Sequence, residues 1–337
     1  MMDLAPSRGG ITAFAPASIG NFAAGFDLMG AALAPLDGTL LGDLVHAAPA
    51  EASSFQLEGP FAGLLAGEAR PNLVQRAAEL FREAAAAKGR PVGPFALRLE
   101  KRLPVASGLG SSASSIVATL AALQALCGDP LSVPELLEVA GQAEGSTSGG
   151  VHLDNVAPSL LGGLQLTVPG RDGGPASRRL PWPTDLLLVV AHPDYQLATA
   201  RSRAALPERP AWTDTVDFAG NLAGFVHALH TGDRALLARC LRDPLVETHR
   251  APLVPGFRAA QAGALAAGAL GCTLSGSGPS IFAVVGDDAD ADVVAEALQR
   301  GFAQAGLASR AWICALDLEG ARLLSPVPRP LFLEAQP

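Results

Sequence analysis

The stretch Pro104–Ala113 reads PVASGLGSSA and is the most informative part of this chain. Its glycines let backbone N–H groups approach a ligand closely, and a helical run beginning near Ser112 points its positive dipole end at the same place. The pattern therefore predicts a phosphate site made from backbone. It is not a Walker A loop, because no Gly-Lys-Ser/Thr follows. Taken alone, a Gly-x-Gly-Ser-Ser loop is equally consistent with a tight structural turn.

Two further glycine- and serine-rich segments lie on either side of this loop in the chain. Pro16–Asp27 reads PASIGNFAAGFD, and Thr273–Ser280 reads TLSGSGPS. In this order the three segments resemble the three motifs of the GHMP kinases, named for galactokinase, homoserine kinase, mevalonate kinase and phosphomevalonate kinase. One departure is Ala106, which stands where many members carry glycine.

Other residues make the homoserine kinases the most similar branch of that family. They are Glu144-Gly145, the segment His152–Pro158 (HLDNVAP), Gly25–Gly30 (GFDLMG), and Arg250 ahead of Leu253–Phe257. The resemblance extends over nearly the whole chain, from about residue 14 to residue 323.

The length of 337 residues exceeds one typical domain and predicts two domains in an α+β arrangement. The resemblance implies the two-domain GHMP kinase fold, with an N-terminal ATP-binding α+β domain at residues 1–168 and a C-terminal ferredoxin-like α+β domain at residues 184–325. The turn-rich interval Pro169–Pro183 is interpreted as the least structured connection. Hydrophobic spacing predicts helices over Asn72–Lys88, Ser112–Leu126 and Pro134–Ala143, the last ending at Glu144-Gly145.

Composition excludes several classes of function. A formal net charge of −8 without a Lys/Arg run argues against nucleic-acid binding. We expect no membrane span and no secretory signal, and therefore a cytoplasmic protein; the four cysteines are expected to be free thiols. A homodimer is left open. Only two of the 24 basic residues are lysines, and both Lys88 and Lys101 are expected to be solvated surface groups.

The resemblance implies that ATP and Mg²⁺ bind at the central loop. The residues expected to bind ATP are Asn72, Pro104, Ser107, Gly108, Leu109, Gly110, Ser111, Ser112 and Ala113. The residues expected to hold Mg²⁺ are Ser112 and Glu144, since one hydroxyl and one carboxylate suit an ion that prefers oxygen and retains water. Asn72 and Ser112 could instead be plain helix caps, and Glu144 a solvated helix terminus.

An amino-acid acceptor presents a carboxylate, an ammonium and a hydroxyl, and each needs a different partner. The residues expected to bind it are Asn21, Asp27, His152, Asp154, Asn155, Arg203, Arg250 and Gly276. Asp154 and Asn155 are the candidates for a catalytic role, with Asp154 a binding residue first and a base second. A carboxylate is best held by a guanidinium fork, and among the 22 arginines the resemblance points to Arg203 and Arg250, whose segments match family positions, with Arg201 as an internal control.

The function that the resemblance implies is ATP-dependent phosphorylation of the side-chain hydroxyl of L-homoserine, giving O-phospho-L-homoserine and ADP, a step of threonine biosynthesis. Two alternatives remain: another GHMP kinase acting on an isoprenoid or sugar alcohol, and a catalytically silent ligand sensor with the same fold.

Overall fold

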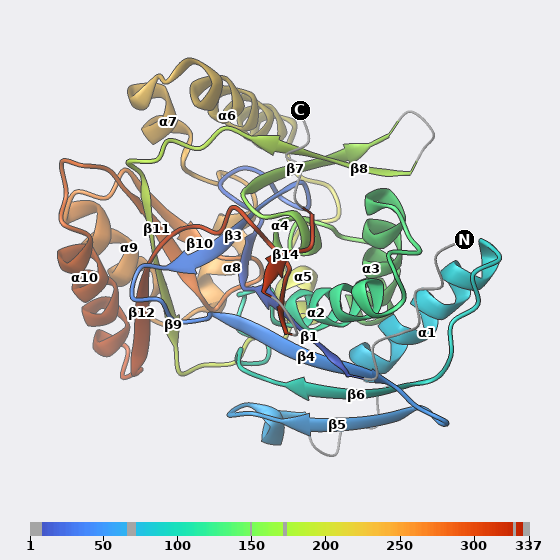
Figure 1. Ribbon diagram of the computed structural model, residues 1–337. Helices are drawn as coiled ribbons and strands as arrows, with labels where there is room; N and C mark the ends of the chain where they lie inside the picture. The colour runs from blue at the N-terminus through green and yellow to red at the C-terminus, as the bar shows by residue number, and fades with distance from the viewer. Residues whose placement is uncertain (1–8, 66–71, 149, 171–173, 326–327, 333–337) are drawn as a thin grey trace.

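Two β-sheets and the helices packed on them make up the structure, a computed structural model that describes residues 9–65, 72–148, 150–170, 174–325 and 328–332 (Figure 1). The first sheet has six strands in the order β14-β13-β1-β4-β6-β5. Their bounds are β1 Ile11–Pro16, β4 Gly42–Pro49, β5 Ser54–Glu58, β6 Phe95–Glu100, β13 Arg322–Ser325 and β14 Arg329–Pro330.

Four helices pack with this sheet around one hydrophobic core. They are α1 Leu73–Ala87, α2 Ser111–Leu126, α3 Val133–Ser148 and α4 Val156–Leu161. Helix α2 is central: it packs on β1 and β4 and is flanked by α1, α3 and α4. Thirteen of its 16 residues are buried, as expected for a helix that is apolar all round. The element that carries the glycine-rich loop is therefore held firmly.

The second sheet runs in the order β10-β11-β9-β12-β3-β7-β8, with β2 paired to β3. The bounds are β2 Ser18–Gly20, β3 Met29–Pro35, β7 Leu164–Pro169, β8 Pro175–Leu180, β9 Leu187–Pro193, β10 Gly271–Leu274, β11 Ile281–Val285 and β12 Ser309–Leu316. The remaining elements are η1 Ala62–Leu64, α5 Thr199–Ala204, α6 Trp212–Thr231, α7 Arg234–Cys240, α8 Val246–Arg250, η2 Ala251–Leu253, α9 Phe257–Ala266 and α10 Ala291–Gln304.

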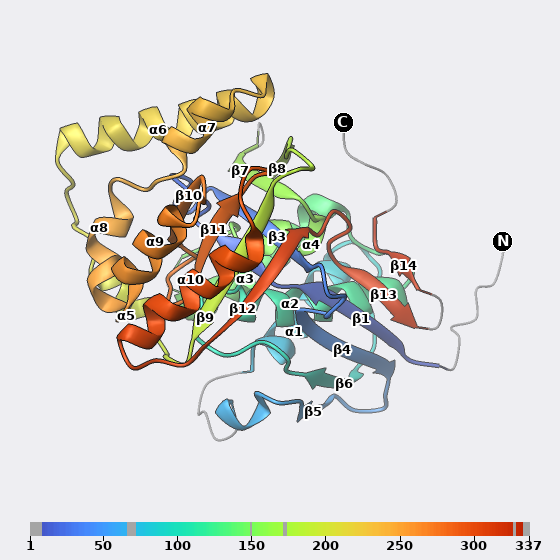
Figure 2. The same cartoon turned by 90° about the vertical axis from the view of Figure 1, so that its left-hand side faces the viewer.

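The C-terminal half has the ferredoxin-like order of elements that was expected. In chain order β9, α9, β10, β11, α10 and β12 form a βαββαβ unit, with α5 to α8 and η2 inserted between β9 and α9, and its strands pair antiparallel. In β9, Leu188 and Val190 face a core shared with α6 and α7, whereas Val189 and Ala191 face a core shared with α9 and α10. Figure 2 shows α9 and α10 side by side, away from α6 and α7; α9 contacts β10 and β11, and α10 contacts β9 and β12.

Three local expectations need correction or refinement. The interval Pro169–Pro183 was expected to be the least structured connection, but it contains β8, which pairs with β7. Helix α3 does not end at Glu144-Gly145 but continues to Ser148. Helix α2 is confirmed and begins one residue earlier than expected, at Ser111.

Candidate active site

The three glycine- and serine-rich segments meet in space at the N-terminus of α2. The N–H of Ser18 donates to the carbonyl of Leu109 at 3.1 Å, and that of Gly276 to the carbonyl of Gly20 at 2.9 Å. From the third segment, the hydroxyls of Ser275 and Ser280 donate to the carbonyls of Gly108 and Ser107, both at 2.6 Å. Hydrogen bonds to backbone carbonyls thus join residues that lie at least 91 positions apart in sequence.

The loop ahead of α2 needs glycine at two positions. Gly108 and Gly110 have φ values of 77° and 63°. A Cβ at Gly108 would lie 2.4 Å from the carbonyl oxygen of Ser275, and one at Gly110 would lie 2.1 Å from the hydroxyl of Ser18. Within the described part of the chain, no side chain caps the N-terminus of α2, so its N–H groups and dipole are available to an anion.

Ser112 and Glu144 lie side by side at this helix end. The Ser112 hydroxyl donates to Glu144 Oε1 at 2.6 Å. Burial raises the pKa of Glu144, while the Ser112 hydrogen bond and the positive charge of Lys101 oppose that rise. A cation beside this carboxylate would stabilise its ionised form, which burial disfavours. A hydroxyl together with a carboxylate is a set of ligands that Mg²⁺ accepts. Among the described residues, no group of three or more His, Cys, Asp or Glu could hold a metal, so phosphate oxygens and water would have to complete its shell.

Asp154 and Asn155 come from the turn before α4 and lie beside the first segment. Asp154 Oδ2 accepts from the N–H of Asn21 at 3.0 Å, and Asn155 Oδ1 accepts from the hydroxyl of Ser18 at 3.0 Å. Burial, with the nearby charge of Asp27, raises the pKa of Asp154 to about 7. A group with that pKa is partly ionised near neutral pH, and the ionised form suits both of the roles expected for it, ammonium binding and proton acceptance.

The first segment holds three non-glycine residues in the left-handed region: Asn21, Ala23 and Asp27, with φ between 53° and 56°. The side-chain oxygen of Asn21 accepts from the N–H of Asp27 at 2.8 Å and holds this turn. Such conformations persist where the surrounding structure imposes them, and they concentrate at functional sites.

The structure pairs Asp27 with two of the other expected site residues. The guanidinium of Arg203 donates to both carboxylate oxygens of Asp27 at 2.9 and 3.1 Å, and His152 Nδ1 lies 3.4 Å from Asp27 Oδ2. Burial lowers the pKa of His152, against the charge of Asp27. The residues expected to hold an ammonium and a carboxylate are therefore already joined to each other.

Arg250 is almost fully buried, with 1% of its surface exposed. It donates to the carbonyls of Gly276 at 3.1 Å and Ser202 at 3.4 Å. Its guanidinium and that of Arg203 lie 5.1 and 5.5 Å from the ring centre of Phe26. Burial and the charge of Arg203 lower the pKa of Arg250 to about 10, so it stays charged at neutral pH. Two cations thus gather around one aromatic ring.

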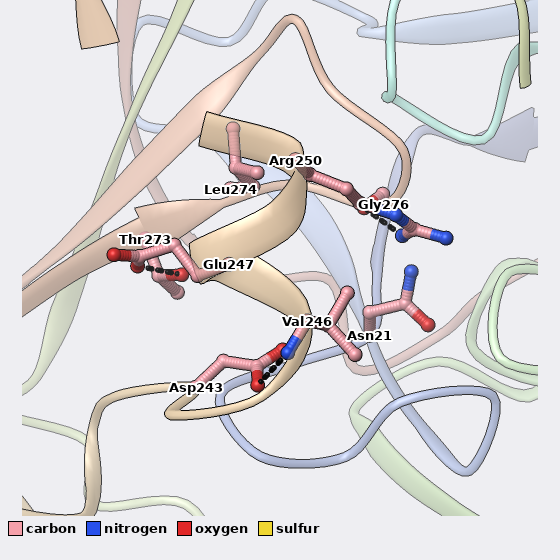
Figure 3. Close-up of a pocket in the computed structure, with 8 residues that line it drawn as sticks. All are labelled: Asn21, Asp243, Val246, Glu247, Arg250, Thr273, Leu274 and Gly276. Carbon is pink, nitrogen blue, oxygen red and sulfur yellow. Dashed lines mark hydrogen bonds between the residues drawn. The ribbon is translucent and has the colours of Figure 1, made fainter. Parts of the chain in front are cut away.

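Helix α8 carries Arg250, and hydrogen bonds at the N-terminus and in the middle of this helix hold it in place (Figure 3). Asp243 accepts from the N–H of Val246 at 2.7 Å, and Glu247 accepts from the hydroxyl of Thr273 at 2.7 Å. These side chains line a cavity of about 10 Å³, the size of one water. Burial raises the pKa of Asp243 to about 6.

A larger cavity, of about 540 Å³, borders the start of the glycine-rich loop. Pro104 and Val105 line it from the first half of the chain, and Tyr195 and Trp312 from the second. The sequence reasoning missed this cavity, because its walls come from separate segments between Thr39 and Trp312 that only the tertiary fold brings together.

The expectation for Lys101 was wrong. Only 2% of its surface is exposed, and its ammonium lies 2.5 Å from the buried carboxylate of Asp43. The burial of Lys101 could have been predicted from the two-residue alternation of a strand. Phe95, Leu97 and Leu99 lie on the buried face of β6, and Lys101 is the next residue in that period. Lys88 is confirmed as a surface group, paired with Glu135.

The other expectations fall as follows. Asn72 caps α1, its side-chain oxygen accepting from the N–H of Val74 at 2.9 Å, and a contact with ATP stays a prediction. Arg201 is exposed, as a control should be. The four cysteines are free. None of the described helices is long and apolar enough to cross a membrane.

The fold has two domains, and at their contact a glycine-rich backbone loop precedes a helix N-terminus with a hydroxyl–carboxylate pair beside it. This arrangement is chemically suited to an anion such as phosphate. Residues 72–163 match the model of the GHMP kinases N terminal domain, and residues 225–304 match that of the GHMP kinases C terminal. A crystal structure of homoserine kinase from Cytophaga hutchinsonii is 33% identical, with a TM-score of 0.84, over 96% of this chain and 99% of that one. The chain belongs to the GHMP kinases, and it is a kinase.

More distant members share the fold. Mevalonate kinase from L. major, solved with R-mevalonate, is 17% identical with a TM-score of 0.67, over 92% of this chain and 97% of that one. Streptococcus pneumoniae phosphomevalonate kinase is 14% identical with a TM-score of 0.65, over 90% and 98%. These two neighbours therefore share the fold with this chain.

Proposed function

We propose that this chain transfers the terminal phosphoryl group of ATP to the side-chain hydroxyl of L-homoserine, giving O-phospho-L-homoserine and ADP, as a step of threonine biosynthesis in the cytoplasm. The observation that carries the proposal is the pair of cations, Arg203 and Arg250, placed with the acidic residues Asp27 and Asp154 beside the glycine-rich loop. Opposite charges of this kind match an amino acid, which carries both a carboxylate and an ammonium.

The nucleotide would bind along the glycine-rich loop, with its phosphates on the N–H groups at the start of α2. The residues assigned to it are Asn72, Pro104, Ser107, Gly108, Leu109, Gly110, Ser111, Ser112 and Ala113. The cavity of about 540 Å³ next to Pro104 and Val105 offers room for the base. Residues 1–168 would form the ATP-binding domain and residues 184–325 its C-terminal partner.

Ser112 and Glu144 would hold Mg²⁺, which neutralises charge on the transferring phosphate when it is bound. The chain's own residues supply the rest. Burial keeps Glu144 away from bulk water. The hydrogen bond from Ser112 fixes the positions of the Ser112 hydroxyl oxygen and of Glu144 Oε1. Phosphoryl transfer depends mainly on such positioning and on charge stabilisation.

Homoserine would bind between the first segment and α8. Arg203 and Arg250 would bind its carboxylate, with Gly276 alongside, and Asp27, Asp154 and His152 would surround its ammonium. An arriving ammonium would lower the pKa of Asp154 and hold it ionised. Asn21 and Asn155 would orient the hydroxyl, and Asp154 could secondarily accept its proton.

A coupled ADP-release assay tests the proposal with homoserine, mevalonate, galactose and serine as acceptors. We expect homoserine to give the highest kcat/KM. ADP release with another acceptor but not with homoserine would reassign the substrate. Nucleotide binding without release for any acceptor would favour the ligand sensor instead.

A further inference from the structure

A single carboxylate, that of Asp43 at the start of β4, contacts the chain on both sides of the glycine-rich loop. Its Oδ1 accepts from the backbone N–H groups of Arg102 at 2.8 Å and Leu103 at 3.0 Å, just before the loop. Its Oδ2 accepts from the hydroxyl of Ser115 at 2.6 Å and from the ammonium of Lys101 at 2.5 Å. Ser115 lies in α2, just after the loop.

Lys101 makes a second connection between the two ends of the glycine-rich loop. Besides Asp43, its ammonium donates to the carbonyl of Ser111 at 2.7 Å and lies 3.0 Å from the hydroxyl of Ser115. The three donors of a lysine are thus matched by three oxygens, two of which belong to the first turns of α2. The backbone just before residue 104 and the helix after residue 110 are thereby tied to one ion pair.

Stability alone does not account for a pair buried this deeply. Both side chains are at most 3% exposed. Taking two charges out of water costs roughly as much as their attraction returns, and apolar residues of similar volume often serve a fold equally well. A buried, fully hydrogen-bonded pair has a different advantage, because each bond accepts only a narrow range of distances and angles.

We propose that Asp43 and Lys101 are positioning residues that hold the two ends of the loop at residues 104–110 in the geometry that binds the nucleotide phosphates. The proposal rests on the assignment of this loop as the phosphate site. Neither side chain contacts the nucleotide; both act through the backbone of residues 102–103 and the first turns of α2.

The test is the double variant Asp43→Asn/Lys101→Met, which leaves no buried charge unpaired and keeps an acceptor for the N–H groups of Arg102 and Leu103. Calorimetry would give the Kd for Mg·ADP and for homoserine, and circular dichroism would confirm the fold. We expect Mg·ADP to bind about tenfold more weakly or worse, since a displacement of about 1 Å at a site can cost that much. The Kd for homoserine should stay within about twofold, because it binds to other residues.

Lys88→Met is the matched control, because Lys88 is the other lysine of the chain and pairs with Glu135 at the surface. It should bind Mg·ADP as the unchanged protein does. A folded double variant with an unchanged Kd for Mg·ADP would overturn the proposal. If the unchanged protein itself bound no Mg·ADP, the assignment of the loop would fail instead, so the two failures are distinguishable.

A second measurement needs no change at these positions. Protein labelled with ¹⁵N only at lysine carries two side-chain amines, and loss of one signal in the Lys88→Met variant assigns both. We expect saturation with Mg·ADP to shift the Lys101 signal and to leave the Lys88 signal in place. A Lys101 signal that does not move while Mg·ADP binds would overturn the proposal even if the double variant failed to fold.

Discussion

Arg250→Leu is the substitution that most directly tests how the acceptor is held. The hydrogen bonds of Arg250 go to two neutral carbonyls, of Gly276 and Ser202, and among the described residues it makes no ion pair. Its charge is therefore poorly compensated in the structure, as the fall of its pKa to about 10 indicates. A substrate carboxylate would supply the missing negative charge, and leucine could not receive it.

The expected magnitude follows from the bonds involved. A hydrogen bond to a charged group contributes about 1.5–3 kcal/mol, so losing one should raise KM for homoserine roughly 10- to 150-fold. The fold also loses two hydrogen bonds, at about 0.5–1.5 kcal/mol each, but is relieved of a buried cation. We therefore expect the free energy of unfolding to fall by about 1–3 kcal/mol, and the protein to remain folded.

The assay is steady-state ADP release, with homoserine varied at saturating ATP and then ATP varied at saturating homoserine. KM for ATP should change little. Arg203→Leu should resemble Arg250→Leu, and the exposed Arg201→Leu should resemble the unchanged protein. Equal rises of KM for both substrates would refute the reasoning, as would an Arg201 variant as impaired as the Arg203 variant. The carboxylate would then be held elsewhere.

Three more outcomes are expected. Glu144→Gln should lower kcat by about 100- to 1000-fold with the fold intact, because charge that stabilises the transition state is lost; an unchanged kcat would remove Glu144 from the site. Because the folded pKa of Asp154 is raised to about 7, its protonated form adds stability that is fully present below the unfolded pKa of about 3.9 and is lost as pH rises through about 7. Denaturant titrations of the ligand-free Asp154→Asn variant should therefore give a free energy of unfolding that falls less steeply with rising pH over that window than the free energy of the unchanged protein. Identical slopes against pH would contradict this account. Ala106 has a φ of 55°, so Ala106→Gly should relieve about 1 kcal/mol of strain and lose about as much to chain entropy, leaving the melting temperature nearly unchanged; a large fall would show that the methyl group itself matters.

Local chemistry was sufficient for the glycine-rich loop and its helix. Gly108 and Gly110 were expected to bring backbone close to a ligand, and both adopt positive φ where a Cβ would collide with another segment. The apolar run after Ser112 could only be a buried helix, and α2 is one. These features depend on residues near one another in sequence.

The end of α3 shows where local signals misled. Gly145 suggested a stop, since glycine costs a helix about 1 kcal/mol relative to alanine. Packing overrode that preference: Ala143 is fully buried, and the helix continues to Ser148. Glu144 consequently lies within the last turns of a helix, facing Ser112, rather than at a solvated helix terminus.

The sequence by itself determined the class of this protein, because three glycine- and serine-rich segments in a fixed order resemble those of the GHMP kinases, whereas the central loop alone would also suit a tight turn. Only the tertiary structure decided which charges meet. Arg203 finds Asp27 across 176 residues and Lys101 finds Asp43 across 58. No local pattern specifies such partners, since a charged side chain in a sequence looks the same whether it will face water or an opposite charge. Burial determines the difference, because a charge removed from water must find a partner, and only the packed fold sets which one lies within reach.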